Sequence, residues 1–384
     1  MKRSKLVFSL SIGLALLLVL SLTLIACTPA PVTQTATATA TSTAIKTTTA
    51  TATSTATQSV KATKIIWSFT DNKGSSWEEV YNPFWSAVEK RTNGAVKFEI
   101  HWSGELSGFF EAYDNVAKGN IDAAQCMVSM YPNLFPLEDV TSIVRYDVKD
   151  LAVSQHITEL ASQFPEMGQA YEKSGTHLLW RTATFPNLSC MGKGKAIRSV
   201  NDFKGKKYLS TGPWDAAMWS ALGMTGLSMM PNETFLNLQT GVVDGATLTL
   251  ASLFDFGWGE VTPFCTETNV RCGSFQDCIN LDKWNSLGPD IQKIFAEEAA
   301  KIPAVMDQQQ LRFDRDLRAQ ATAKWGTEFI KLPAADYVTM TQLTTPVQAK
   351  FKADFDAKGL PGTKILDAWF KLLDKYSGSA YALK

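Results

Sequence analysis

The stretch from Asn201 to Thr249 constrains the fold more than any other part of the chain. Lys206 to Ser210 predicts a short strand, and Gly212-Pro213 then opens a helix, because glycine is an accepted N-cap and proline fits the first helical turn. A second helix is expected from Glu233 to Thr240, and a second strand from Val242-Val243 that leaves through a sharp Asp-Gly turn. Strand, helix, helix and strand in so few residues is typical of one lobe of an α/β protein.

The N-terminal residues predict export from the cytoplasm. A basic start precedes an apolar run from Leu6 to Ile25, and Leu-Ile-Ala-Cys ends this run at Cys27. This arrangement resembles a bacterial lipobox, so residues 1–26 are predicted to be a signal peptide and Cys27 to carry lipid. The alternative is an uncleaved transmembrane anchor, since the run approaches the roughly 20 residues that a span needs. We favour the lipobox because Cys27 ends the apolar run and Thr-Pro follows at once.

Residues 27–63 are predicted to form a disordered tether behind the lipidated cysteine. Thr28 to Thr63 consists almost entirely of Thr, Ala and Ser and lacks the apolar surface that would offset its ordering entropy. A coil of this length reaches about 35 Å. The remaining residues are numerous enough for two lobes. The chain has 37 Lys and Arg against 37 Asp and Glu, so no basic field indicates nucleic acid as a partner.

The rest of the chain alternates predicted strands and helices. Apolar positions predict a strand at 65–69 and an amphipathic helix at 77–88, which Pro83 should kink or divide. The other expected elements are strands at 96–102, 121–128, 177–181 and 274–281 and helices at 111–118, 157–171, 291–324 and 366–376. The strand at 177–181 is expected to cross between lobes and the strand at 274–281 to return. This assigns 64–186 plus about 275–315 to the first lobe, and 187–274 plus about 316–384 to the second.

Three motifs carry a family resemblance that runs from about Ile65 to the C-terminus. In ETFLNLQTGVVDG, the residues from Glu233 to Gly245 match the pattern E-x-x-x-x-L-q-x-G-v-v-D-G. KRTNGAVKFEIHWSGELSG and NVAKGNIDAAQ precede it in the same order as in the family. The chain therefore resembles the substrate-binding proteins of TRAP transporters, the DctP-like family. The resemblance implies an α/β, two-lobe periplasmic-binding-protein-like (type II-like) fold with an interlobe cleft and long C-terminal helices.

The resemblance also implies a function. Such a protein is expected to close its lobes on a small organic molecule and deliver it to the TRAP permease membrane subunits, without a cofactor. An ABC-type solute-binding lipoprotein is the first alternative, and an extracytoplasmic enzyme or an adhesion protein are the others. The chain has three histidines, His101, His156 and His177, and none stands in a catalytic or phosphate-binding motif. We therefore expect a binding protein and not an enzyme.

The cysteines beyond Cys27 are read as structural. Cys265, Cys272 and Cys278 lie close together in the sequence, so one disulfide among them is plausible outside the cytoplasm, with buried free thiols as the alternative. Their spacings are longer than those of short Cys-x-x-Cys metal sites, so we expect no metal.

The predicted ligand departs from the commonest ligands of the family. The family motif G-l-K-i-R supplies an arginine that binds a ligand carboxylate, and Leu209 stands at that position here. Leu248 stands where the family often has a polar residue. Both differences suit an organic acid that is not a simple dicarboxylate, or a neutral ligand. Arg181 and Asn187, at the crossing between lobes, are the predicted polar contacts, with an Arg181 ion pair at the lobe interface as the alternative.

Several indoles complete the predicted site. Ligands of α/β lobes bind outside the carboxyl ends of the strands, so Trp67, Trp214 and Trp258 are candidates for the cleft. Each of them could equally be a core residue. The free backbone N–H groups at the N-terminus of the helix that begins at Pro213 are a further candidate contact for an anion.

Overall fold

The structure of the protein is a computed structural model. It describes residues 62–146, 152–184, 188–192, 194, 196–229, 231–268 and 273–376. The predicted signal peptide, the lipidated Cys27 and the Thr-rich tether lie outside the described residues, as does Asn187. No helix among the described residues is both long enough and apolar enough to span a membrane.

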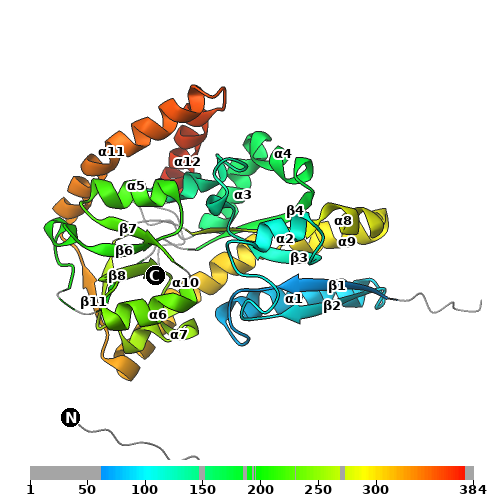
Figure 1. Cartoon of the computed structure of the whole chain (residues 1–384), viewed down its shortest axis with the longest axis horizontal. Helices are drawn as coiled ribbons and strands as arrows, with labels where there is room; N and C mark the ends of the chain where they lie inside the picture. Colours follow the sequence, from blue (N-terminus) through cyan, green and yellow to red (C-terminus); the bar gives the residue numbers. More distant parts are fainter. Residues whose placement is uncertain are drawn as a thin grey trace, which may run out of the picture. The chain divides into compact units, whose positions relative to one another are not determined.

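Five strands form the first sheet, in the order β2-β1-β3-β10-β4 (Figure 1). These strands are β1 (Thr63–Ser68), β2 (Val96–His101), β3 (Ala123–Cys126), β4 (Thr176–Ala183) and β10 (Ser274–Asn280). β1 pairs in parallel with β2 and β3, whereas β10 is antiparallel to β3 and β4. The predicted return of residues 274–281 to the first sheet is therefore confirmed. We call this sheet and its helices the first lobe.

Six strands form the second sheet, in the order β11-β9-β5-β8-β6-β7. They are β5 (Leu188–Met191), β6 (Lys207–Ser210), β7 (Thr225–Ser228), β8 (Gly245–Leu248), β9 (Phe264–Glu267) and β11 (Glu328–Lys331). β6 runs parallel to β7 and β8, and β5 is antiparallel to β8 and β9. We call this sheet and its helices the second lobe.

Helices pack against both sheets. They are α1 (Ser76–Arg91), α2 (Ala112–Ala117), α3 (Val153–Gln163), α4 (Glu166–Lys173), α5 (Pro213–Ala221), α6 (Pro231–Thr240), α7 (Ser252–Asp255), α8 (Leu281–Ser286), α9 (Pro289–Ala299), α10 (Ile302–Trp325), α11 (Ala334–Asp356) and α12 (Gly362–Tyr376). The long α11 and α12 run side by side, orange and red in Figure 1. α11 packs on α5 and α12 packs on α3, so the C-terminal helices contact elements of both lobes.

Aromatic rings fill the core of the first lobe. Trp67 on β1 is fully buried, and its indole stacks on Trp180 of β4 at 5.7 Å and lies 6.0 Å from Phe84 of α1. β1 pairs on both edges and α1 packs on the face that carries Trp67, so this side chain is shielded from solvent, whereas Ile66 on the opposite face is half-buried. Pro83 lies inside α1 without dividing it, so of the two predicted effects, a kink or a division, the division is wrong.

The stretch that most constrained the fold is largely as predicted. β6 and α5 occupy the expected residues, and α5 begins at Pro213 behind the Gly212 N-cap. The expected strand at Val242-Val243 is wrong, since the chain turns there and β8 begins only at Gly245. The reason is close packing: a Cβ at Gly245 would lie 2.6 Å from the ring of Tyr208, so only glycine allows β8 to approach β6 here.

Three other predictions need correction. The single helix expected at 157–171 is two helices, α3 and α4, because the chain breaks at Phe164-Pro165. The helix expected at 291–324 is likewise two helices, α9 and α10, which are separated at residues 300–301. The disulfide joins Cys190 to Cys265 and not two of the last three cysteines. β5 and β9 are antiparallel neighbours that place these two residues directly opposite, with Cα atoms 4.1 Å apart. Cys278 is a buried free thiol, and Cys272 lies outside the described residues.

Candidate ligand-binding site

A small cavity lies where strands of both sheets end. Its lining residues follow the carboxyl ends of parallel strands in each lobe: Asp71 and Met127 come after β1 and β3, and Thr211 and Thr249 come after β6 and β8. The others are Ser76, Trp77, Phe109, Thr184, Ser252, Asp255, Phe256, Gly273, Phe275 and Gln310. We call it the inter-sheet cavity. This is the position at which α/β lobes bind ligands.

Aromatic rings form the first-lobe wall of the inter-sheet cavity. Trp77 and Phe275 meet edge to face at 5.0 Å, and Phe109 lies 6.3 Å from Phe275. All three side chains are buried, and Met127 beside them is 3% exposed. Phe256 adds a half-buried ring from the second lobe. The wall offers flat, polarizable surfaces to a ligand.

Two carboxyl groups face the same cavity. Asp71 is 3% exposed, and its Oδ2 has no hydrogen-bond partner among the described residues. Burial and the nearby Asp255 carboxylate raise the pKa of Asp71 to about 7. Burial also raises the pKa of Asp255, although Ser76 donates hydrogen bonds to it. Asp71 and Asp255 are the only ionisable residues among those that line the cavity in the described part of the chain.

Ser76 and Asp255 connect the two lobes at this cavity. The backbone N–H of Ser76 donates to Asp255 Oδ1 at 3.1 Å, and its hydroxyl donates to Oδ2 at 2.6 Å. Ser76 begins α1 in the first lobe, whereas Asp255 ends α7 in the second. The cavity volume is about 40 Å³, which is room for a group the size of one to a few water molecules. The described conformation is therefore one in which the lobes are tied together and a larger ligand needs them to open.

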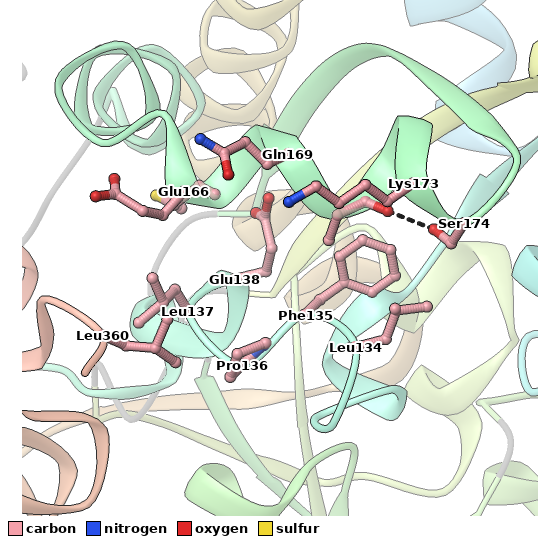
Figure 2. Close-up of a pocket in the computed structure, with 12 residues that line it drawn as sticks. Leu134, Phe135, Pro136, Leu137, Glu138, Glu166, Gln169, Lys173, Ser174 and Leu360 are labelled. Atoms are coloured by element: carbon pink, nitrogen blue, oxygen red, sulfur yellow. Dashed lines mark hydrogen bonds between the residues drawn. The ribbon is translucent and has the colours of Figure 1, made fainter. Parts of the chain in front are cut away.

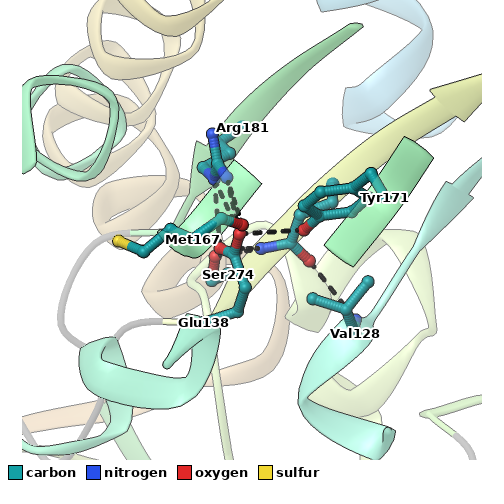
Figure 3. A network of polar contacts seen from close by, with 7 residues as sticks. Val128, Glu138, Met167, Tyr171, Arg181 and Ser274 are labelled. Carbon is teal, nitrogen blue, oxygen red and sulfur yellow. Dashed lines mark hydrogen bonds and ion pairs between the residues drawn. The ribbon is translucent and has the colours of Figure 1, made fainter. Parts of the chain in front are cut away.

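Arg181, the predicted ligand contact, lies in a buried ion pair (Figure 3). Its Nη2 donates to Glu138 Oε1 at 2.6 Å and to the Met167 carbonyl at 3.1 Å, and its Nε lies 3.0 Å from Oε1. Tyr171 donates to the same carboxylate at 3.0 Å. Burial lowers the pKa of Arg181, but Glu138 more than offsets this, so the net pKa is raised. The alternative of an ion pair is therefore what the structure contains, and Arg181 is not among the residues that line the inter-sheet cavity.

A second pocket is lined in part by Glu138, the acid of this ion pair (Figure 2). Its volume is about 320 Å³, and Glu166, Gln169 and Lys173 of α4 form one side. Leu360, from the connection between α11 and α12, and the segment 134–138 form the rest. Its buried acid, Glu138, already has the guanidinium of Arg181 as partner. We call it the α4 pocket. Unlike Asp71 in the inter-sheet cavity, none of its described lining residues has a buried polar side-chain atom without a hydrogen-bond partner.

The other predicted site residues lie in the protein core or outside the described residues. Trp67, Trp258 and Leu209 are at most 1% exposed and belong to hydrophobic clusters. Trp214 packs on Phe351 of α11 at 5.0 Å. None of these four lines the inter-sheet cavity. The side chain of Leu248 is outside the described part of the structure, although its neighbour Thr249 reaches the cavity.

The N-terminus of α5 has acidic neighbours instead of open space. Asp215, in the first turn, accepts a hydrogen bond from the Thr211 backbone N–H at 2.9 Å. A Cβ at Gly212 would lie 3.0 Å from Asp139 Oδ2. The carboxyl groups of Asp215 and Asp139 therefore lie at the N-terminus of α5, the candidate contact for an anion that the sequence predicts. Across the described ranges, no cluster of His, Cys, Asp or Glu has the arrangement of a metal site.

Sequence reasoning missed the residues that line the inter-sheet cavity. A usable signal was present, since Asp71 stands three residues beyond the end of β1, at the strand end where ligands bind. The same rule, applied to Trp67, chose a residue inside the strand. Phe275 lies in the strand predicted at 274–281 but was not chosen as a site residue, and Asp255 gave no local signal because the region that follows Phe254 carries no clear periodicity.

A cavity shared by the strand ends of two α/β lobes, which are tied together across it, defines a two-lobe solute-binding protein. The family model of bacterial extracellular solute-binding proteins, family 7 (DctP), matches residues 67–354. Since this is well over half of the chain, the protein belongs to that family. It is an extracytoplasmic solute receptor of the TRAP type, and the match favours this over the ABC-type alternative. The similar proteins are solute-binding receptors and not enzymes.

Individual relatives agree with the family. The C4-dicarboxylate-binding periplasmic protein DctP of Rhodobacter capsulatus is 23% identical over 290 residues, covering 74% of this chain and 85% of the relative. A TRAP periplasmic solute-binding protein from Desulfovibrio salexigens has a TM-score of 0.69 at 25% identity, covering 83% of this chain and 98% of that one. One from Rhodoferax ferrireducens, in complex with copurified benzoate, has a TM-score of 0.74 at 20% identity, covering 82% and 99%. The two-lobe α/β fold is thereby confirmed.

Proposed function

We propose that this receptor captures a small organic acid, other than a simple dicarboxylate, in the inter-sheet cavity and delivers it to the membrane subunits of a TRAP permease. One observation carries the proposal: the cavity combines strand ends of both lobes with a buried carboxyl group, Asp71, that has an unpartnered oxygen. Such a group is costly to bury unless a ligand supplies its partner.

The lining of the cavity supports the exclusion of simple dicarboxylates. Among its described residues there is no Arg or Lys, so two ligand carboxylates would meet Asp71 and Asp255 without a compensating cation. The aromatic wall of Trp77, Phe109 and Phe275 suits a flatter ligand. The similar proteins include both classes of ligand, since one is specific for aromatic acid ligands and another contains succinate.

The site assignment is tested by filling the cavity. Ser252→Trp places an indole in a space of about 40 Å³ and should abolish binding of any ligand found by a thermal-shift screen of organic acids. Leu360→Trp is the matched control, because it alters the α4 pocket instead. If Leu360→Trp blocks binding and Ser252→Trp leaves it intact, the ligand site is the α4 pocket and the assignment is wrong.

We propose further that Cys27 carries the lipid that anchors this receptor to the membrane. The proposal rests on the basic start, the apolar run and the Leu-Ile-Ala-Cys sequence. Cys27→Ser should release the protein from the membrane fraction or leave it unprocessed, as read from cell fractionation and the mass of the product. A variant that is processed and retained like the parent would contradict it.

A further inference from the structure

We propose that the ligand of the inter-sheet cavity carries a protonated amine, and that this ammonium group is held by the carboxylates of Asp71 and Asp255 against the aromatic wall. The inference rests on the proposed function, since it concerns the same cavity. It goes further by assigning a charge to the part of the ligand that the cavity receives. An amino acid or another zwitterion meets both proposals.

The charge balance of the cavity is the first argument. Both ionisable side chains that line it in the described residues are acidic, and one comes from each lobe. Two buried carboxylates without a cation repel each other and lose their hydration. An ammonium group between the two carboxylates would offset both their repulsion and their lost hydration. It would also give the ligand one contact with each lobe.

Asp71 provides the second and independent observation. Asp71 lines the cavity, and its Oδ2 is buried and has no hydrogen-bond donor among the described residues. The Asp255 carboxylate, in contrast, already accepts the hydroxyl and the backbone N–H of Ser76. The structure therefore contains an acceptor that lacks a donor, and an ammonium group has three donors and no acceptor.

The wall and the volume of the cavity fit the same group. Trp77, Phe109 and Phe275 present ring surfaces, and cations bind favourably near such rings. A volume of about 40 Å³ accommodates a head group close in size to a water molecule, as –NH₃⁺ is. A trimethylated nitrogen would need the lobes to open further.

The opposite arrangement is a protonated Asp71 that donates a hydrogen bond to a ligand carboxylate. The two arrangements predict opposite pH dependence. Asp71 and Asp255 are the titrating groups that face the cavity, and the pKa of Asp71 is raised to about 7. A cation needs the ionised form, so its affinity should rise about tenfold per pH unit from pH 5 to 7 and then level. A carboxylate held by protonated Asp71 should bind almost equally well from pH 5 to 6, weaken from about pH 7, and lose about tenfold in affinity per pH unit above it.

The experiment compares matched probes by calorimetry on the full extracytoplasmic protein. Benzylammonium, benzyl alcohol and benzoate share one shape and differ in charge, and 3-(aminomethyl)benzoate carries both charges. A series of alkylammonium ions and amino acids extends the comparison to other lengths. We expect the ammonium-bearing probes to bind at least about tenfold more tightly than their neutral and anionic counterparts at pH 8, which is the range for a charge-assisted hydrogen bond.

Two variants locate the effect. Asp71→Asn keeps the shape and should weaken the ammonium probes about tenfold to a hundredfold while abolishing the pH dependence. Asp354→Asn removes a carboxylate from the exposed face of α11, and it should change neither the affinity for the ammonium probes nor its pH dependence. Circular dichroism and the melting temperature establish that both variants fold.

The outcomes separate this inference from the proposed function. Failure of every ammonium-bearing probe to bind at millimolar concentration overturns the inference. So does carboxylate-only binding that weakens as the pH rises. If Ser252→Trp blocks that carboxylate binding, the proposed function stands without the amine. If ammonium probes bind but neither Ser252→Trp nor Asp71→Asn affects them, the ligand site lies elsewhere and both proposals fail.

Discussion

Two buried carboxylates of the first lobe, Glu138 and Asp71, differ in the hydrogen-bond partners that surround them. Glu138 is 2% exposed and accepts hydrogen bonds from Arg181 and Tyr171, with Gln276 at 3.5 Å (Figure 3). Asp71 is 3% exposed, and one of its oxygens has no partner in the described structure. Burial therefore does not distinguish these two acids. They differ in their hydrogen-bond partners and in that Asp71 lines the inter-sheet cavity.

The difference has an energetic meaning. A buried carboxylate that is paired with a guanidinium contributes little net stability, but it fixes the position of its neighbours. One without a partner reduces stability, and its retention needs an explanation, of which a ligand that completes the site is the one proposed for Asp71. Arg181 and Glu138 are such a pair. The Arg181 guanidinium donates hydrogen bonds to Glu138 and to the Met167 carbonyl, and it thereby holds β4 to α4.

The largest expected effect is on the paired acid. Glu138→Ala leaves the Arg181 guanidinium buried without its counter-ion and should lower the free energy of unfolding by about 3–5 kcal/mol. Glu328→Ala is the control, because Glu328 pairs with Arg198 at the surface, where the two side chains are 47% and 57% exposed. Its loss should cost less than about 1 kcal/mol.

Urea unfolding measures both variants. The double variant Glu138→Leu with Arg181→Met should recover much of the loss, because no charge is then left unpaired. If Glu138→Ala instead leaves stability unchanged and removes ligand binding, Arg181 and Glu138 belong to the binding site, and the contrast with Asp71 disappears.

The sequence predicts what local signals determine. Gly212-Pro213 fixes the start of α5, and alternating apolar residues fix β2, because these depend on neighbours within one turn or one strand. The two-lobe fold follows from motifs distributed along the chain. Local signals also mislead, as at Val242-Val243, where β-branched residues favour a strand but the packing of Gly245 on Tyr208 sets where β8 begins.

The partners of buried charges and cysteines are not local. Arg181 and Glu138 are 43 residues apart, and Cys190 and Cys265 are 75 apart. Each pair meets only because the lobe topology brings its segments together, so no spacing rule reveals it. Asp71 is different, since its position just beyond β1 could have been recognised from the strand-end rule. Trp67 was chosen by that rule in error, because it lies within β1 and points into the core.

The second-largest expected effect is the dependence of the free energy of unfolding on pH through Asp71, the acid with an unpartnered oxygen. The pKa of Asp71 is raised from 3.8 to about 7, so the folded protein binds this proton more tightly than the unfolded chain does. The stability from this group is therefore present below pH 4 and is lost as the pH rises through about 7. At about 1.4 kcal/mol per pKa unit, the loss reaches at most about 4 kcal/mol.

Asp71→Asn should remove this loss. Without ligand, the variant should be more stable than the parent at pH 8, with an advantage that shrinks steadily toward pH 4. Asp354→Asn, on the exposed face of α11, should shift stability by less than about 1 kcal/mol at either pH. Urea unfolding between pH 4 and 8 gives the difference curve. A flat curve would mean that Asp71 has a counter-ion in the folded protein, and the two acids would no longer differ.

The smallest expected effect is on the hydrogen bond that ties the lobes across the inter-sheet cavity. Ser76→Ala removes the hydroxyl that donates to Asp255 Oδ2 at 2.6 Å and keeps the backbone N–H bond at 3.1 Å. The loss of one such bond should shift the balance from closed to open by about 1 kcal/mol, or about fivefold. Because ligand binds the closed form, its apparent affinity should fall by at most that factor.

Small-angle scattering and calorimetry test this tie between the lobes. The ligand-free Ser76→Ala protein should have a larger radius of gyration than the parent, and saturating ligand should restore the parent value, since ligand stabilises the closed form by mass action. Ser286→Ala removes an exposed hydroxyl that bonds only within its own helix region and should change neither property. Identical scattering from Ser76→Ala and the parent, with unchanged affinity, would show that Asp255 serves the ligand and not the closure. Its contrast with the fully paired Glu138 would then be sharper still, because both cavity acids would act through the ligand alone.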